Sequence, residues 1–528
     1  MVLRLFAIIA LLLVVAYLGV TSTERNQGEF TYALDDTYIH LAVAKNIATD
    51  GTWGINPGAC SPCTSSIAWP LLLALLGAAT TWGVWVPLIL NLILAALVLW
   101  VADSWMEELE VGWIIRGGVL VGFVLVVPLA VLAILGLEHV AQVLLALSLM
   151  RWGVRRADGA APLSIGMILA VLLVSVRFEG IFLVAGVAWM LWAEGRRDDA
   201  VRLFLSGLTP FVVFGSLSMV LGARFFPTPI WMKGKLASEL LPALREGGGD
   251  PTMWVQFVID FLFIGPIRNL AEVGVLAWLV LLGLARLVWS QVRGLRLTAL
   301  GAALATTWMH LVFARTGWLG RYEAWLIALL AVMLAPTAQR FFVRAREGRW
   351  NLRLILPVLL IAFGLFPVRA RVASTMFQAN RGSTNIHEQQ VQMARFFGAF
   401  HAGEAVGVND IGAVGYYSGV EVVDFWGLSD LDIAERRLAG TLNPIEIDWA
   451  AQTRGVEVVA MYEDVLDETG GAPTSWVPVA DWRIRRNAVC GSSRLTWYAT
   501  SAEAAPTLRA QLEQWSSELP ATVDARWR

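Results

Sequence analysis

The residues best suited to chemistry form a short acidic stretch near the N-terminus, Asp35-Asp36-Thr37-Tyr38-Ile39-His40. This stretch opens a predicted helix that ends near Asp50-Gly51, and Asp36 and His40, four residues apart, share one face of it. Two adjacent carboxylates beside a membrane helix have the chemistry of a general base and its orienting partner for an alcohol nucleophile. The same residues also fit a structural role, with Asp35 as N-cap and Asp36 near the positive end of the helix dipole. Both interpretations stay open at this point.

A second acidic position, Glu138 followed by His139, lies between two apolar runs. A carboxylate at this depth costs free energy unless it faces protein or water, so a functional role and a headgroup-level pair with His139 are both open. Together with Asp35, Asp36 and His40, these residues are ligand types for a divalent cation. Their spacing fixes no coordination geometry, so no metal ligands are assigned and a divalent cation is only a possible cofactor.

Basic residues recur in the loops at the ends of apolar runs, often beside an acidic residue. They are Arg177 with Glu179, Lys233, Arg315, and Arg321 with Glu323. Each of these side chains could simply extend toward lipid headgroups. Arginines on the non-cytoplasmic side are less expected, because Lys and Arg concentrate in cytoplasmic loops. As a set they indicate an anionic ligand at the bilayer surface, most naturally a lipid phosphate, since a guanidinium group can bind two oxygens at once.

The elements that must hold these residues are membrane spans. Of the 528 residues, 57% are hydrophobic and 16% are charged, and the mean hydropathy is +0.62. Soluble domains have roughly 45–50% apolar and about 25% charged residues, so a soluble enzyme, a disordered chain and a fibrous repeat are excluded. We expect an α-helical polytopic membrane protein with about eleven transmembrane helices. The apolar runs are Met1–Val20, Val84–Val101, Ile114–Leu135, His139–Trp152, Leu163–Val176, Ile181–Trp192, Leu203–Leu221, Val273–Trp289, Ala299–Phe313, Tyr322–Leu334 and Leu354–Phe366.

Loop charges predict which side of the membrane each loop occupies. The runs Ile67–Leu76 and Phe257–Ile264 are too short to cross and are expected to be interfacial or re-entrant helices. With this count, the four basic clusters fall on the side of the N-terminus, which the positive-inside rule makes cytoplasmic; they are Arg155–Arg156, Arg196–Arg197, Arg293 with Arg296, and Arg344–Arg349. The long first loop, residues 21–66, then lies outside the cytoplasm together with the acidic and basic loops described above. The net charge of −2 gives no basic field that would indicate nucleic acid.

The C-terminal 160 residues have the size of a single domain. We therefore expect a membrane domain at residues 1–368 and an extracytoplasmic domain at residues 369–528. Short β-type runs in it alternate with helix-like segments (Ile386–Phe400 and Ala502–Glu518), which predicts an α/β fold; the runs are Ala405–Val408, Val420–Val423, Val456–Met461 and Leu495–Ala499. The patch Asn409–Gly415 lacks the full G-x-G-x-x-G pattern, so no dinucleotide site is expected.

Three cysteines are too few for a disulfide framework. Cys60 and Cys63 form a C-x-x-C pair, no second pair completes a zinc site, and Cys490 stands alone. On an oxidising side of the membrane, a local disulfide is favoured over two free thiols, and the sequence does not decide between them.

Several of these motifs resemble the GT-C superfamily of integral-membrane glycosyltransferases. Asp35–Ile39 is followed by Asn56-Pro57-Gly58 and by Thr64-Ser65-Ser66-Ile67-Ala68-Trp69. The likeness is strongest to the polyprenyl-phosphate-sugar-dependent enzymes of the protein-mannosyltransferase and aminoarabinose-transferase type, and bacterial cell-wall arabinofuranosyltransferases have a similar Asp-Asp opening. Further landmarks are matched by Gly136–His139, Arg177–Gly180 and Arg321-Tyr322-Glu323. The chain departs from the pattern at Cys60-Ser61-Pro62-Cys63 and at Phe178, where a proline is common, so donor details are not carried over.

The resemblance implies a GT-C fold in a bacterial inner membrane. It also implies a polyprenyl-phosphate-linked sugar donor and an inverting transfer, on the outer face, to a glycan, lipid or protein hydroxyl. Asp35 and Asp36 would be catalytic, and Glu138 matches the second acidic position of the family. We expect Asp36 or Asp35 to accept the proton of the acceptor hydroxyl, and Arg177, Lys233, Arg315 and Arg321 to stabilise the leaving phosphate. The expected substrate-binding set is completed by His40, His139, Glu179, Tyr322 and Glu323.

Two other classes of protein compete with this interpretation. A lipid-linked sugar transporter would place polar residues near the midplane of broken helices and show repeated halves, whereas here the charges gather at span ends and no repeat is visible. A non-catalytic envelope scaffold would be favoured if the first-loop carboxylates were caps that point away from any cavity. The sequence determines neither the sugar nor the acceptor nor the length of the lipid.

Overall fold

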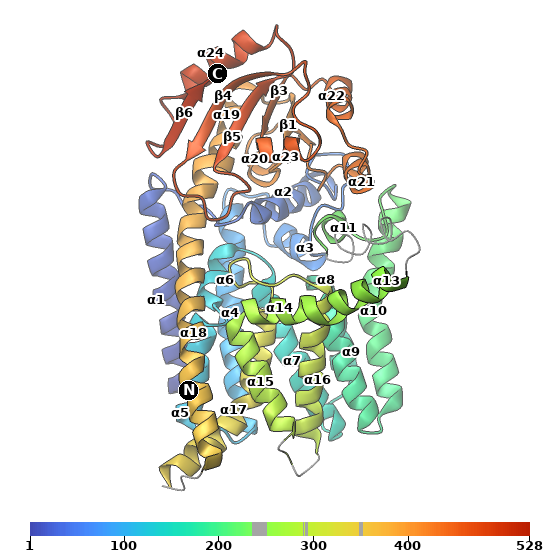
Figure 1. Ribbon diagram of the computed structural model, residues 1–528, viewed down its shortest axis with the longest axis vertical. Coiled ribbons are helices and arrows are strands. Elements are labelled where there is room, and N and C mark those ends of the chain that lie inside the picture. Colours follow the sequence, from blue (N-terminus) through green and yellow to red (C-terminus); the bar gives the residue numbers. More distant parts are fainter. Residues whose placement is uncertain (235–250, 289, 291–293, 348–351) are drawn as a thin grey trace.

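The computed structural model describes all residues except 235–250, 289, 291–293 and 348–351. Its helical bundle and its α/β domain are stacked along the long axis, with the first loop between them (Figure 1). The N-terminus lies toward the end of the bundle that is remote from the α/β domain. Arg156 pairs with Asp199 at 2.9 Å, and Arg196 donates to the carbonyl of Ala157, so two of the basic clusters lie at one end of the bundle.

Long apolar helices make up most of the bundle, as a multi-pass membrane protein requires. Their bounds are α1 Val2–Arg25, α4 Val86–Glu108, α5 Trp113–Leu125, α6 Leu129–Leu135, α7 His139–Ala157, α8 Leu163–Val176, α9 Gly180–Ala193, α10 Arg197–Val220, α15 Gly274–Val288, α16 Leu295–Phe313, α17 Ala324–Arg346 and α18 Leu352–Ile386. Within the described chain, six helical stretches are long and apolar enough to cross a bilayer, and three shorter apolar helices accompany them. The helical membrane architecture is confirmed, while the figure of eleven crossings stays a prediction.

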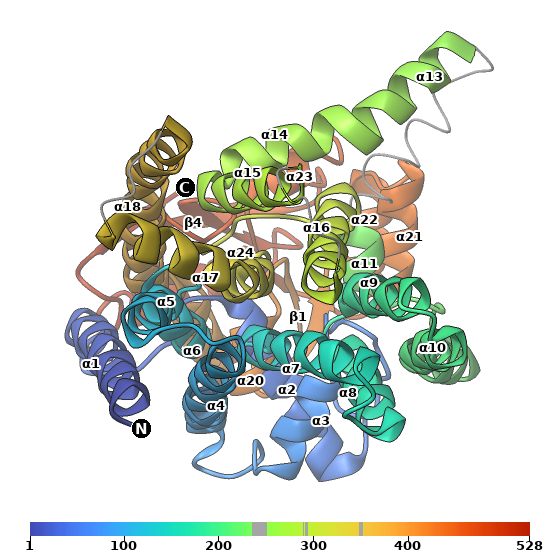
Figure 2. The same ribbon diagram turned by 90° about the horizontal axis from the view of Figure 1, so that it is seen from below.

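The two runs that were expected not to cross the membrane, Ile67–Leu76 and Phe257–Ile264, differ from the long helices in length or in orientation. Ile67–Leu76 forms α3 (Ala68–Leu75), whose eight residues span about 12 Å and cannot cross a bilayer. Phe257–Ile264 lies in one continuous stretch made of α13 (Pro251–Ile259), the π-helix η3 (Asp260–Ile264) and α14 (Gly265–Glu272). Although this stretch is long and apolar enough to cross, it lies across the other helices in Figure 1 and along the outside of the bundle in Figure 2. This position fits an interfacial helix.

The first loop contributes the layer between the bundle and the α/β domain. Its helix α2 runs from Asp35 to Asp50, as the sequence predicts, and Gly51 ends it in the left-handed conformation at φ +74°. Short α3 and α11 (Thr228–Lys233) lie in the same layer (Figure 1). A layer of short helices just outside the spans is well placed to form a site that contacts both lipid and water.

The C-terminal part is an α/β domain, as expected. Helix α18 runs unbroken through the expected boundary between residues 368 and 369 and is followed by η4 (His387–Val391) and α19 (Gln392–Phe400). A six-stranded sheet has the order β2-β1-β3-β5-β4-β6, in which β1 pairs in parallel with β2 and β3 and the other pairs are antiparallel. The elements are β1 Ala405–Val408, α20 Gly412–Tyr417, β2 Glu421–Asp424, α21 Leu431–Ala439, α22 Pro444–Thr453, β3 Val458–Met461, α23 Glu463–Asp467, β4 Val477–Ile484, β5 Arg494–Ala499, α24 Ala505–Trp515 and β6 Val523–Trp527.

Two of the six strands were not predicted from the sequence. Strand β4 contains Pro478 at an irregularity of its pairing with β5, which interrupts the alternating pattern. Strand β6 is at the edge of the sheet and has no fully buried residue, so it lacks the apolar face by which strands are recognised. Aromatic packing holds the sheet to α19, with the rings of Phe396 and Trp497 4.6 Å apart.

Candidate functional site

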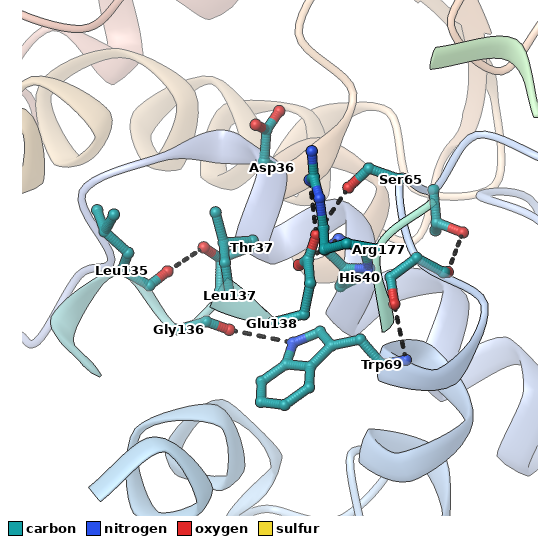
Figure 3. Close-up of polar contacts among 12 residues, drawn as sticks. Asp36, Thr37, His40, Ser65, Trp69, Leu135, Gly136, Leu137, Glu138 and Arg177 are labelled. Atoms are coloured by element: carbon teal, nitrogen blue, oxygen red, sulfur yellow. Dashed lines mark hydrogen bonds and ion pairs between the residues drawn. The ribbon is translucent and has the colours of Figure 1, made fainter. Parts of the chain in front are cut away.

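The turn between α6 and α7 fixes the position of the acidic residues (Figure 3). The hydroxyl of Thr37 donates to the carbonyl of Leu135 at 2.5 Å, and the indole of Trp69 donates to the carbonyl of Gly136 at 3.2 Å. Gly136 has φ +69°, and a Cβ there would lie 2.5 Å from the ring of Tyr32. Only glycine fits this turn, which brings α2, α3 and the start of α7 together.

Glu138 is the centre of a buried polar network (Figure 3). Its Oε1 accepts hydrogen bonds from Arg177 Nη1 at 2.9 Å and from Ser65 Oγ at 3.1 Å, while His40 Nε2 lies 3.5 Å from Oε2. Arg177 also forms a fork with Glu179, with Nη2 2.6 Å and Nε 3.1 Å from the two carboxylate oxygens. The network joins the first loop to the ends of α7, α8 and α9.

The charge state of this network follows from burial and from its arginine. Burial by itself would raise the pKa of Glu138, but the neighbouring His40, His139 and Arg177 lower it, to about 2. Burial also lowers the pKa of His40, although Glu138 acts in the opposite direction. The histidine ring is therefore neutral at pH 7, and Arg177 is the permanent positive charge that keeps Glu138 ionised.

A cavity of about 510 Å³ opens beside this network. Its polar lining comprises Asp36, His40, Thr64, Ser65, His139, Arg177, Glu179, Arg315, Arg321 and Tyr322. Its apolar lining comes mainly from α9, α10, α11, α16 and the segment before α11, and includes Phe178, Ile181, Phe182, Phe211, Phe226, Pro229, Ile230, Trp231 and Phe313. Cys63 of the first loop and Leu428 of the α/β domain complete the wall. One pocket thus combines charged groups with a broad aromatic surface.

Asp36 and Arg321 face each other in this cavity. Arg321 Nη2 donates to Asp36 Oδ2 at 2.8 Å and to the hydroxyl of Tyr322 at 2.9 Å. The guanidinium groups of Arg321 and Arg177 lie 4.8 Å and 5.7 Å from the centre of the Tyr322 ring. Arg321 Nε and Nη1 are buried and have no hydrogen-bond partner among the residues that the structure describes. These two donors are available to an anion in the cavity.

Comparison with known proteins shows the fold of the chain. The apo oligosaccharyltransferase of Archaeoglobus fulgidus matches with a TM-score of 0.51 at 13% identity, over 94% of this chain and 74% of that one. Its complex with Zn and sulfate matches with a TM-score of 0.48 at 14% identity, over 97% and 74%. ArnT from Cupriavidus metallidurans, bound to undecaprenyl phosphate, matches with a TM-score of 0.46 at 11% identity, over 94% and 98%.

This protein has the GT-C fold. No curated protein matches the chain. The family model of a domain of unknown function (DUF8728) matches residues 384–499, which lie in the α/β domain. The expected GT-C architecture is therefore confirmed at the level of the fold.

Within the GT-C fold the two adjacent aspartates have different surroundings. Asp35 does not line the cavity: its carboxylate accepts hydrogen bonds from the backbone N–H groups of Gly412 and Ala413, at 2.7 Å and 2.8 Å. The N-cap of α2 is Leu34, so Asp35 is not the cap of its own helix either. Burial, with a contribution from Asp410, raises the pKa of Asp35 to about 7. Asp35 thus joins the first loop to the α/β domain, and Asp36 alone of the pair faces the cavity.

Glu323 and Lys233 differ from the other candidate residues. Glu323 is buried outside the cavity lining, where it accepts from Arg371 Nη1 at 2.5 Å and from the N–H of Gly317 at 2.8 Å. Arg371 also donates to the carbonyl of Gly320 at 2.8 Å, so this pair holds the loop that carries Arg315 and Arg321. Lys233 is the last residue of α11, and its side chain lies outside the described part of the chain.

Several residues that shape the site have a weak signal or none in the sequence. Ser65, which donates to Glu138, lies within the Thr64–Trp69 motif but was not singled out. Arg371 lies in α18 near the expected domain boundary, and Leu428 lies in the α/β domain. Nothing in the local pattern of either residue indicates its role, because Arg371 contacts Glu323 and Gly320 and Leu428 lines the cavity across long distances in the chain.

Cys60 and Cys63 are both free thiols, which differs from the favoured disulfide. Cys60 is exposed, whereas Cys63 is buried in the cavity wall, where burial raises its pKa to about 12. The two side chains occupy different surroundings although only two residues separate them. At its present position Cys63 contributes a small apolar group to the cavity.

The carboxylates of the site are paired with arginines and not with each other. Asp36 contacts Arg321, and Glu138 contacts Arg177. Among the described residues, no group of three or more His, Cys, Asp or Glu side chains is arranged to hold a metal ion.

Proposed function

We propose that this protein is an integral-membrane glycosyltransferase that takes a sugar from a polyprenyl-phosphate donor. The observation that carries the proposal is the composition of the cavity: Asp36, Arg177 and Arg321 line one part, and an aromatic surface lines the rest. A polyprenyl-phosphate sugar has the matching parts, which are an isoprenoid chain, a phosphate and a polar sugar. The GT-C fold supports the proposal but does not by itself define a reaction.

The donor phosphate binds at Arg321 in this proposal. Its Nε and Nη1 offer two hydrogen bonds from different edges of the guanidinium group, and Arg177 adds a second positive charge across the ring of Tyr322. Arg315 is exposed at the same cavity and attracts the anion as it approaches. The isoprenoid chain packs against the apolar lining from α9, α10 and α16, of which Phe182, Phe211 and Phe313 are members.

Asp36 is the general base of the proposed reaction. It accepts the proton of an acceptor hydroxyl while the hydroxyl oxygen bonds to the anomeric carbon. The bond between that carbon and the phosphate oxygen breaks, and its electron pair leaves with the polyprenyl phosphate, whose charge Arg321 and Arg177 stabilise. Attack opposite the leaving group inverts the configuration of the sugar. A glycan, lipid or protein hydroxyl fits the acceptor role equally well.

The ion pair between Asp36 and Arg321 makes the basicity of Asp36 depend on whether the donor is bound. While Arg321 donates to Asp36, the carboxylate is stabilised as the anion and is a weak base. A donor phosphate that takes over hydrogen bonds of Arg321 weakens this pair and makes Asp36 a better proton acceptor. The base thus becomes active when the donor is in place.

The proposed reaction takes place on the extracytoplasmic face of a bacterial inner membrane. The cavity is lined by His139 at the start of α7 and by Leu428 of the α/β domain, whereas Arg156 lies in the last turn of α7, where it and Arg196 cluster. The positive-inside rule makes that basic end cytoplasmic. The α/β domain then covers the active site from outside and reaches the cavity with Leu428.

The test uses the purified protein in nanodiscs with radiolabelled undecaprenyl-phosphate sugars and envelope membranes from cells that lack the protein, which supply the acceptor. Wild type is expected to release undecaprenyl phosphate and to label the envelope. Asp36→Asn is expected to slow the release by a factor on the order of 10²–10⁴. The matched variant is Asp103→Asn, which removes a buried carboxylate at the other end of the bundle. Full activity of a folded Asp36→Asn protein would contradict the assignment of the base.

A further inference from the structure

His139 is a buried polar side chain of the cavity that the proposed mechanism does not use. It is the first residue of α7, and only 2% of its surface is exposed. Neither ring nitrogen has a hydrogen-bond partner among the described residues, although the side chain lines the cavity. Its ring centre lies 5.9 Å from that of Tyr322. A buried ring with two unsatisfied nitrogens costs free energy, and a ligand in the cavity would remove that cost.

The ring makes no hydrogen bond to the carboxylate network among the described residues, although it follows Glu138 in the chain and interacts with it electrostatically. The hydrogen bonds of Glu138 go to Arg177 and Ser65, and the histidine nearest to it is His40. Burial of the ring favours its neutral form and outweighs the opposing effect of Glu138. A neutral imidazole has one donor and one acceptor nitrogen. A hydroxyl group matches this pattern because it also donates and accepts.

The position of His139 relative to Arg321 indicates which part of a donor it meets. Both side chains contact Tyr322. Arg321 lies over the Tyr322 ring and donates to its hydroxyl, and the His139 ring packs against the Tyr322 ring. Arg321 and Arg177 are also close enough to act electrostatically on His139. In the proposed donor complex these two guanidinium groups bind the phosphate, and the sugar attached to the phosphate lies next to them. The hydroxyls of that sugar are the groups within reach of His139.

We propose that His139 binds a hydroxyl of the transferred sugar through its two unpartnered ring nitrogens, which makes it a specificity-determining residue for the sugar. The donor class is then a polyprenyl-phosphate sugar with a free hydroxyl near its anomeric carbon. This inference rests on the proposed function and adds the part of the donor that His139 contacts. It assigns no proton transfer to His139, since Asp36 is the base.

The test compares the binding of undecaprenyl phosphate alone with that of a panel of undecaprenyl-phosphate pentoses and hexoses, using full-length protein in nanodiscs. Wild type is expected to bind at least one glycosylated lipid more tightly than undecaprenyl phosphate. His139→Phe keeps a flat ring but removes both nitrogens. It is expected to lose this sugar-dependent gain, by about tenfold, while the affinity for undecaprenyl phosphate stays within about twofold.

Two further variants make the result decisive. His139→Asn keeps one donor and one acceptor and is expected to retain part of the sugar-dependent gain, and it replaces His139→Phe if that variant does not fold. His401→Phe makes the same change in the α/β domain, where His401 contacts Glu404 and Gln511, and is expected to bind like wild type.

Three outcomes would overturn the inference. Equal losses of affinity for undecaprenyl phosphate and for the glycosylated lipid would place His139 at the phosphate. Unchanged binding, or a wild type that does not distinguish glycosylated from free lipid, would leave the ring without a role in sugar binding. If wild type binds no polyprenyl phosphate at all, the proposed function itself fails, and the inference fails with it.

Discussion

Arg321 Nη2 lies 2.8 Å from Asp36 Oδ2, although 285 positions separate the two residues in the chain. This contact joins α2 of the first loop to the loop before α17, and both residues line one cavity. A carboxylate and a guanidinium group that meet at the mouth of an aromatic pocket are suited to bind and cleave a phosphate-linked donor. The predictions below follow from this contact and from the residues that support it.

Replacement of Arg321 tests its role in donor binding. Arg321→Gln is expected to weaken binding of undecaprenyl phosphate by about 10- to 100-fold, because hydrogen bonds to charged groups contribute about 1.5–3 kcal/mol. Arg321→Lys keeps the charge but not the planar set of guanidinium donors, so its affinity is expected to fall between those of wild type and Arg321→Gln. Arg509→Gln is the matched control, since Arg509 pairs with Glu513 in the α/β domain. Wild-type affinity in Arg321→Gln would place the phosphate elsewhere.

The pair formed by Arg371 and Glu323 tests how the Arg321 loop is held. Arg371→Met leaves Glu323 as a buried carboxylate without its cation, which is expected to cost about 3–5 kcal/mol of unfolding free energy. The double variant Arg371→Met, Glu323→Gln is expected to be more stable than Arg371→Met alone, since the uncompensated charge is gone. Denaturation of wild type, Arg371→Met, Glu323→Gln and the double variant in detergent gives the coupling energy. Additive effects would show that the two side chains do not act as a pair.

Gly136 tests the turn that positions Glu138. Alanine there requires a residue at φ +69° and places a Cβ 2.5 Å from Tyr32, so Gly136→Ala is expected to destabilise the protein by at least about 1–2 kcal/mol. Gly118→Ala is the control, because a Cβ at Gly118, within α5, meets nothing within 4 Å. That change is expected to be neutral or stabilising by about 0.5–1 kcal/mol. Equal melting temperatures for the two variants would contradict the proposed constraint.

Asp35 predicts a pH dependence of stability. Burial raises its pKa in the folded protein to about 7, against about 3.9 in the unfolded chain. The folded state therefore holds the proton more tightly, and the contribution of Asp35 to stability decreases as pH rises from about 4 to about 7, by at most about 1.4 kcal/mol per pH unit. Asp35→Asn removes this titration, so its melting temperature should fall less steeply over that range than that of wild type. Parallel curves would contradict the prediction, and Asp50→Asn in the same helix is the control.

The membrane part and α2 could be predicted from the sequence because both depend on local patterns. Apolar runs define helices wherever they occur, and α2 extends from Asp35 to the residue before Gly51 as its spacing and its C-terminal glycine predict. Strands β4 and β6 were not recognised, since a proline irregularity and an exposed edge remove the alternation on which such predictions depend. The sequence favoured a disulfide between Cys60 and Cys63 without deciding it, because spacing does not show that Cys60 is exposed while Cys63 is buried.

The sequence by itself determined that this chain is a helical membrane protein with an acidic first loop, because hydropathy and spacing act over a few turns of chain. Only the tertiary structure decided which aspartate faces the cavity. Asp35 is turned away by the N–H groups of Gly412 and Ala413, whereas Asp36 meets Arg321. Adjacent residues on a helix point about 100° apart, so their roles depend on what packs against each side. Those neighbours come from parts of the chain hundreds of residues away.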